Sequence, residues 1–119
     1  MSRLETHLQK ARTFQQGADQ ATSPEMRVEA WFLAAYHLIE ACAAKRHIHI
    51  QKHQRVPGEL KRNPGIFAER TAEVSEAYQY LDGEARAKFV YGASGTDEEL
   101  DRARSSFETV RRRCEEALR

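Results

Sequence analysis

The stretch AWFLAAYHLIEACAAK, residues 30–45, decides the fold that we expect for this chain. Its apolar residues recur at steps of three and four, which is the period of an amphipathic α-helix. Together with Val28 they form a stripe so wide that more than one neighbouring element is needed to cover it. We therefore predict a long helix over about 24–44 at the centre of a helical bundle.

Local signals predict where the helices begin. Ser23 can cap the central helix, and Pro24 fits the first helical position, where its missing N–H costs nothing. Before it, residues 3–18 keep the helical period. Near the other end of the chain, Thr96 and Glu99 have the spacing of a capping box. A strict three–four alternation of apolar residues follows them, so we expect a final helix there.

Between these helices, two turn signals interrupt the pattern, PG at 57–58 and NPG at 63–65. They leave room for only a short helix. The helical period resumes over 66–81, and the Asp-Gly pair at 82–83 is a possible break. The sequence thus predicts one all-α domain over residues 1–119, an up-and-down bundle of four main helices plus one short helix.

Composition narrows the class of protein. The chain has 119 residues, 31% of them charged and 40% hydrophobic, which is ordinary for a soluble globular domain. No apolar run approaches the roughly 20 residues that span a bilayer, and the charged N-terminus lacks a signal-peptide core. We therefore expect a cytoplasmic protein without membrane contact. Cys42 and Cys114 fall on apolar helix faces, so we expect reduced core thiols.

Positive charge is concentrated in one segment. Residues 1–44 carry four Lys/Arg against five Asp/Glu, residues 45–62 carry six against one, and residues 63–119 carry nine against twelve. The basic segment opens with KRHIHIQKH at 45–53, which holds three histidines. Such a segment can face an anion such as phosphate. The alternative is a solvated turn that keeps the protein soluble.

The histidines of this segment are candidate metal ligands. His47, His49 and His53 could offer imidazoles to zinc. However, no Asp or Glu lies between residues 41 and 58, and lysines and arginines that would oppose a divalent ion crowd the same stretch. We therefore expect neither a metal nor another cofactor. The two cysteines also lack the His and acid signature of a nucleophile.

The order of these segments resembles that of a HEPN domain (higher eukaryotes and prokaryotes nucleotide-binding). This resemblance implies a bundle of four to five helices, often dimeric, that is either a metal-independent ribonuclease or a non-catalytic nucleotide or RNA binder. Such domains commonly act beside a small nucleotidyltransferase. The resemblance covers roughly residues 28–114 and rests on AWFLAAYHLIEACAAK at 30–45, KHQRV at 52–56, RAKFVYG at 86–92 and TDEEL at 96–100.

Catalytic members of that family carry an Arg followed by four to six residues and a His. Arg86 stands near the corresponding place, but Tyr91 follows where the His would be. The resemblance therefore implies a non-catalytic binder, with a toxin-type ribonuclease as the alternative. A second formal match, Arg46-x6-His53, lies too early in the chain for the family's site. Its chemistry is reasonable, since His can act as general acid or base while Arg neutralises phosphate.

These considerations give a specific set of candidate residues. If the chain is a ribonuclease, we expect Arg46 and His53 to be catalytic. A pure protein-interaction module is the remaining alternative. We also expect a homodimer or a complex with another protein, built on the central helix and a neighbouring helix, because one short chain has limited means to cover both Trp31 and Phe32. The alternative is that the first helix covers this second face. The family resemblance implies a nucleotidyltransferase as the partner. The predicted nucleotide or RNA phosphate site comprises Arg46, His49, Lys52, His53, Arg86 and Tyr91.

Overall fold

The computed structural model describes residues 2–92 and 94–119, and within these ranges it is all-α, without strands, as predicted. The five α-helices are α1 (Arg3–Gln20), α2 (Pro24–Lys45), α3 (Val56–Arg62), α4 (Thr71–Gln79) and α5 (Asp97–Leu118). Three further helical segments are the 3-10 turns η1 (His53–Arg55) and η2 (Ala68–Arg70) and the π-helix η3 (Tyr80–Tyr91).

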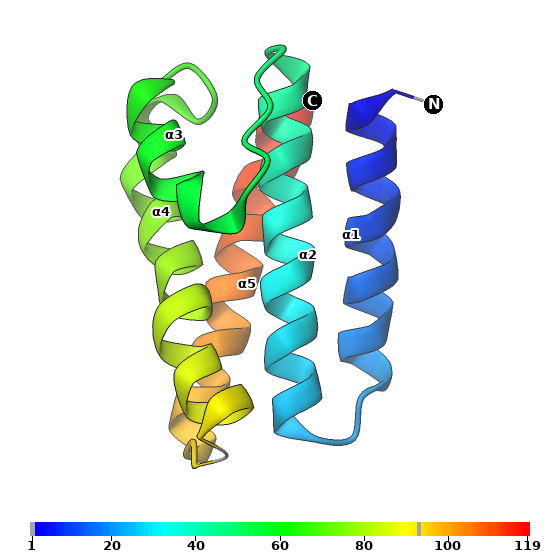
Figure 1. Ribbon diagram of the computed structural model, residues 1–119, viewed down its shortest axis with the longest axis vertical. Helices are drawn as coiled ribbons and strands as arrows, with labels where there is room; N and C mark the ends of the chain where they lie inside the picture. Colours follow the sequence, from blue (N-terminus) through cyan, green and yellow to red (C-terminus); the bar gives the residue numbers. More distant parts are fainter. Residues whose placement is uncertain (1, 93) are drawn as a thin grey trace.

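The helices form an up-and-down bundle (Figure 1). Helix α1 runs antiparallel to α2, α4 continues directly into η3, and α5 returns beside them. Helix α2 packs against α1 on one side and against α5 and η3 on the other, so it is the central helix that the sequence predicts. The short helix α3 lies beside α4.

The predicted helix starts are confirmed by their caps. The hydroxyl of Ser23 accepts a hydrogen bond from the Met26 amide at 3.2 Å. At α5, the Glu99 amide donates to the Thr96 hydroxyl at 3.1 Å, and the Thr96 amide donates to the Glu99 carboxylate at 3.0 Å. These reciprocal bonds form the predicted capping box. Local chemistry alone therefore fixes both starts.

The possible break at Asp82-Gly83 does not occur, because η3 runs through both residues. A glycine inside a helix costs about 1 kcal/mol relative to alanine. Burial of the flanking Tyr80, Leu81 and Ala85, none more than 6% exposed, offsets this cost. The helical path therefore persists, and it brings the side chain of Asp82 close to His53.

The expectation that Trp31 and Phe32 need a second chain to cover them is also wrong. Both are buried within the one chain, at 6% and 2% exposure. The Arg86 guanidinium lies over the Phe32 ring, 4.2 Å from its centroid, and that of Arg104 lies 5.6 Å from the Trp31 centroid. Long basic side chains thus cover both rings. A homodimer remains a prediction, but the need to cover Trp31 and Phe32 no longer supports it.

Both cysteines are buried and free, as predicted. The Cys42 thiol lies 3.6 Å from the Cys114 carbonyl oxygen and donates to it. Burial is the main cause that raises the pKa of the Cys114 thiol. Across the described residues, no helix combines the length and apolar character needed to cross a membrane.

Candidate functional site

The buried carboxylate of Glu40 fixes the loop 46–52 beside the candidate site. Glu40 on α2 is only 1% exposed, and it accepts hydrogen bonds from the amides of Ile50 at 3.0 Å and Gln51 at 3.2 Å. The Tyr36 hydroxyl donates to the same carboxylate at 2.9 Å. Burial, followed by this bond, raises the pKa of Tyr36, so its hydroxyl remains a donor. Glu40 thereby fixes the chain just before His53.

His53, the first residue of η1, is held between α2 and α4. Its ring lies edge-on to Phe32, with 5.3 Å between ring centroids, and to Tyr36, with 6.5 Å. The Tyr78 hydroxyl donates to the His53 backbone carbonyl at 2.9 Å. Burial is the main cause that raises the pKa of Tyr78. Aromatic contacts and one backbone bond therefore fix the position of the imidazole.

The two ring nitrogens of His53 have different surroundings. Nδ1 is buried and lies 3.4 Å from Oδ1 of Asp82. That distance is long for a hydrogen bond, and Nδ1 has no hydrogen-bond partner within the described structure, so the contact is an electrostatic approach. Nε2 has no hydrogen-bond partner among the described residues either and, unlike Nδ1, is not buried.

A carboxylate behind one imidazole nitrogen with the other nitrogen open to solvent is an arrangement that can transfer protons. The open nitrogen can accept a proton from a bound molecule or donate one to it. The His53 side chain is 36% exposed, so a substrate can approach it.

Arg86 on η3 is bound on several sides. Its guanidinium donates to Glu29 at 3.2 and 3.4 Å, to Asp82 at 3.0 Å and to the Tyr91 hydroxyl at 3.0 Å. Burial lowers the pKa of Arg86, but the bonds to Glu29 and Asp82 outweigh it, and the net result is a raised pKa. Two carboxylates thus already balance its charge, and Arg86 acts first as a clamp between α2 and η3.

The bond between Arg86 and Tyr91 depends on the π-helical winding of η3. In an α-helix, residues five apart point about 140° away from each other. A π-helix pairs residue i with residue i+5, so both side chains lie on one side. The R-x4-Y spacing therefore forms a bonded pair here. Tyr91 is 72% exposed, so most of its surface remains open beside the site.

We call Glu29, Phe32, His53, Asp82, Arg86 and Tyr91 the His53 cluster. It contains three of the residues predicted from the sequence, His53, Arg86 and Tyr91. The sequence reasoning missed Glu29, because an acidic residue on a helix surface gives no local signal of a partner 57 residues away. Asp82 stands four residues before Arg86, the spacing of a helical ion pair, but the possible break at Asp82-Gly83 obscured that signal. The sequence reasoning also missed Glu40, although a charged residue within the apolar sequence of the central helix could have indicated a buried carboxylate.

The other predicted residues lie outside this cluster. His49 and Lys52 are exposed and make no ion pair in the described structure. Arg46 lies against Gly65 and lines a separate cleft of about 280 Å³ with Arg70 and Arg113. In the described structure, Arg46 and His53 share neither a hydrogen bond, an ion pair nor a cleft. The geometry therefore pairs His53 with Asp82 and Arg86.

Among the described residues, no three or more His, Cys, Asp or Glu side chains are grouped so as to hold a metal ion. Comparison with known proteins gives no relative, since no protein-family model, curated protein or solved structure matches the chain.

Proposed function

We propose that the chain binds single-stranded RNA or a nucleotide through the basic surface of residues 45–62 and the adjoining His53 cluster. One observation carries this proposal: Arg46, Lys52, Arg55 and Lys61 make no ion pair in the described structure, whereas every arginine of α5 between 102 and 113 is paired with a carboxylate. Phosphate groups would supply the missing negative charge.

The neighbouring aromatic side chain suits the same class of ligand. Tyr91 is largely exposed and lies next to Arg86, with the guanidinium carbon 5.5 Å from its ring centroid. Exposed aromatic rings beside cations are typical platforms on which unpaired bases stack. The HEPN-like order of helices supports the same proposal, and with it a nucleotidyltransferase partner or a second copy.

Fluorescence anisotropy with a labelled single-stranded RNA tests the proposal. We expect binding at about 50 mM salt that weakens steeply by about 200 mM, because phosphate contacts release counterions. The triple variant Lys52→Gln/Arg55→Gln/Lys61→Gln removes three contacts and should reduce the slope of log affinity against log salt by about 2.

A control variant, Arg3→Gln/Lys10→Gln on α1, removes two charges from another face. It should leave the affinity for RNA within about twofold. Equal losses in both variants would show unspecific attraction to a cationic protein. Absence of binding at about 50 mM salt would contradict the proposal and favour a protein-interaction module, whose apolar interface is less sensitive to salt.

A metal-independent ribonuclease is the second candidate, and the His53–Asp82 geometry favours it. Nε2 of His53 would take the proton from an RNA 2′-hydroxyl, whose oxygen attacks phosphorus and expels the 5′-oxygen of the next nucleotide, which takes a proton from water. The products are a 2′,3′-cyclic phosphate and a 5′-hydroxyl. Cleavage in EDTA that is lost in His53→Gln and retained in His49→Gln would support it. Cleavage that survives His53→Gln would indicate another site or a contaminating nuclease.

A further inference from the structure

Helix α1 covers one side of the bundle but supplies little of its core. It packs along α2, which separates it from α4 and η3 (Figure 1). The buried residues of α1 are the small Ala11 and Ala18, whereas its larger apolar side chains, such as Leu8 and Phe14, are partly exposed. Among the described residues, the large side chains that are fully buried all lie between residues 28 and 110. The core therefore belongs to the rest of the chain, and α1 lies on its surface.

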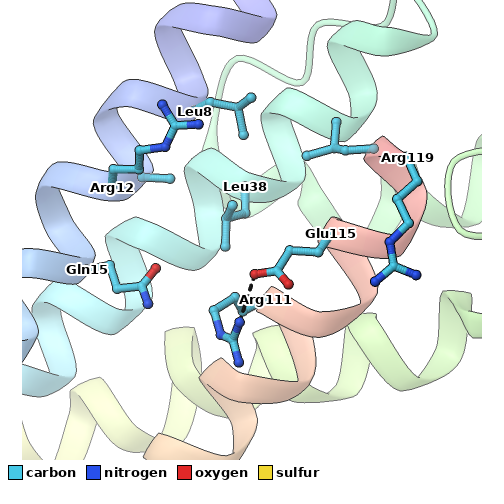
Figure 2. A pocket seen from close by; sticks show the side chains of 9 residues that line it. Leu8, Arg12, Gln15, Leu38, Arg111, Glu115 and Arg119 are labelled. Atoms are coloured by element: carbon cyan, nitrogen blue, oxygen red, sulfur yellow. Dashed lines mark hydrogen bonds and ion pairs between the residues drawn. The ribbon is translucent and has the colours of Figure 1, made fainter.

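Open clefts flank α1 on both sides. The cleft toward α5 has a volume of about 330 Å³, and Figure 2 shows Arg12 and Gln15 of α1 across it from Arg111 and Glu115 of α5. The bond drawn there joins the two α5 residues to each other. The second cleft, of about 400 Å³, lies along α1 beside His37. In the part of the chain that the structure describes, no ion pair joins α1 to another element. Helix α1 is therefore held mainly by its contact with α2.

One side-chain hydrogen bond joins α1 to another element within the described ranges. It links Nδ1 of His7 on α1 to Nδ1 of His37 on α2 at 2.9 Å, and we call these two residues the histidine pair. The Phe14 ring stacks on His37 with 5.7 Å between centroids, and the Tyr36 ring lies edge-on to it at 5.1 Å. The bond needs one nitrogen that accepts, so it is lost when both rings are protonated.

The surroundings of the histidine pair favour its neutral form. Burial is the main cause that lowers the pKa of both rings, and Lys10 on α1 lowers them further. Arg3 on α1 and His49 in the loop also lower the pKa of His7. Glu40 on α2 opposes both shifts, but its carboxylate already accepts three hydrogen bonds. A detached α1 would expose both rings to water, where they bind protons at the ordinary histidine pKa, so acid favours detachment.

We propose that the histidine pair is a pH-sensitive switch: protonation of both rings detaches α1 from α2 while residues 24–119 stay folded. Two imidazolium rings at this distance repel each other and leave a donor facing a donor. Because α1 supplies no large buried side chain, its loss leaves the core intact. Detachment uncovers the side of α2 that carries Ala30, Ala34 and Ala41, at helical spacing from His37. Acid thereby exposes an apolar surface without unfolding the whole chain.

Native-state hydrogen exchange of the full chain at pH 7 and pH 5, corrected for the intrinsic exchange rate at each pH, tests this proposal. At pH 7 we expect the opening constant of α1 amides to exceed that of α5 amides at least about tenfold. Between pH 7 and pH 5 the opening constant of α1 should rise about fivefold. Equal opening constants in α1 and α5 at both pH values would show one cooperative unit and overturn the proposal. So would an opening constant of α1 that does not change with pH.

Three variants decide whether the histidine pair is the switch. His7→Gln/His37→Gln removes both titrating rings and keeps polar side chains that can bond to each other, so the opening of α1 should no longer rise at pH 5. His47→Asn, at an exposed position with a positive φ of 61°, should keep the parent's rise. His7→Lys places a permanent charge beside His37 and should open α1 at pH 7 at least about fivefold, while α5 stays protected.

Two results from these variants would overturn the proposal. One is a pH-dependent opening of α1 that survives in His7→Gln/His37→Gln. The other is an α1 that stays as closed in His7→Lys at pH 7 as in the parent chain.

Discussion

The Nδ1 atoms of His7 and His37 lie 2.9 Å apart, so the two imidazoles share one hydrogen bond across the interface of α1 and α2. One nitrogen must donate and the other must accept, which requires at least one neutral ring. Burial, and then the neighbouring His7, lower the pKa of His37 to about 4. Burial also lowers the pKa of His7. The folded chain therefore favours neutral histidines at this interface.

We expect acid to weaken the fold through this pair. Both pKa values are lower in the folded state than the ordinary histidine pKa of 6.5, so the unfolded chain binds more protons. The stabilisation is complete above about pH 6.5 and is lost as the pH falls toward 4. Glu40 opposes both shifts, while Lys10 adds to them. Because solvent screens these half-buried rings, we expect a loss of about 1 kcal/mol, measured by urea unfolding at pH 7 and 5.

The control for this prediction compares two histidine variants. His37→Gln should unfold with a smaller difference in free energy between pH 7 and pH 5 than the parent chain. His47 is exposed at a positive φ of 61°, which Asn tolerates, so His47→Asn should keep the parent's difference. If His37→Gln keeps the full pH dependence, the acid sensitivity arises elsewhere.

Glu40 should contribute strongly to stability. Glu40→Gln replaces one carboxylate oxygen with an amide NH₂, which cannot accept a hydrogen bond. Depending on its orientation, this NH₂ faces either the Ile50 amide or both the Gln51 amide and the Tyr36 hydroxyl, which are donors too. We expect about 2–3 kcal/mol of destabilisation in urea unfolding. Hydrogen exchange at Ile50 and Gln51 should also accelerate. Glu76→Gln, at an exposed position, should stay within about 0.5 kcal/mol. Similar losses in both variants would show that Glu40 has no special role.

Two glycines should respond to alanine with opposite signs. A Cβ at Gly95 would collide with the ring of Phe89, which is buried at 4% exposure and cannot easily move. We expect Gly95→Ala to lower the free energy of unfolding by about 1–3 kcal/mol. A Cβ at Gly17, inside α1, would meet no atom within 4 Å, so Gly17→Ala should stabilise by about 0.5–1 kcal/mol. Thermal unfolding of both variants checks the prediction, and a tolerated Gly95→Ala would contradict the packing.

The two thiols should react only when the chain unfolds. Cys42 and Cys114 are 2% and 0% exposed, and the reactive form of a thiol is the thiolate, which burial disfavours at Cys114. At pH 8 we expect an aromatic disulfide reagent to label native protein far more slowly than protein in urea. The labelling rate should rise with urea in parallel with unfolding. Rapid labelling of one thiol without urea would show that this part of the core opens locally.

Signals close together in the sequence were sufficient for most of the fold. The Ser23 cap and the Thr96–Glu99 capping box each involve residues three apart, so the starts of α2 and α5 could be predicted without tertiary information. The continuation of the helix through Gly83 could not be predicted in this way, because the burial of Leu81 and Ala85 that compensates for the glycine exists only after the helices pack. The burial of Trp31 and Phe32 likewise depends on arginines from distant elements.

The candidate site could be predicted only in part. Unusual local composition singled out His53, and the family resemblance singled out Arg86 and Tyr91. The acids near these residues were not predicted. Glu29 meets Arg86 only because α2 packs on η3, and Asp82 lies at the possible break, where no helix was expected to continue. Helix packing thus decided which charges of the chain became neighbours.

Because η3 is a π-helix, the geometry of the His53 cluster depends on the number of residues between Arg86 and Tyr91 as well as on which residues these are. Deleting a single residue between Arg86 and Tyr91, such as Ala87, would allow this segment to rewind as an ordinary α-helix while every residue of the cluster is retained. The remaining four-residue spacing would be that of an α-helical neighbour. η3 itself would become one residue shorter, and Phe89 would shift relative to Gly95. Chains of this kind could therefore preserve every residue of the cluster and still lose its geometry through one deletion.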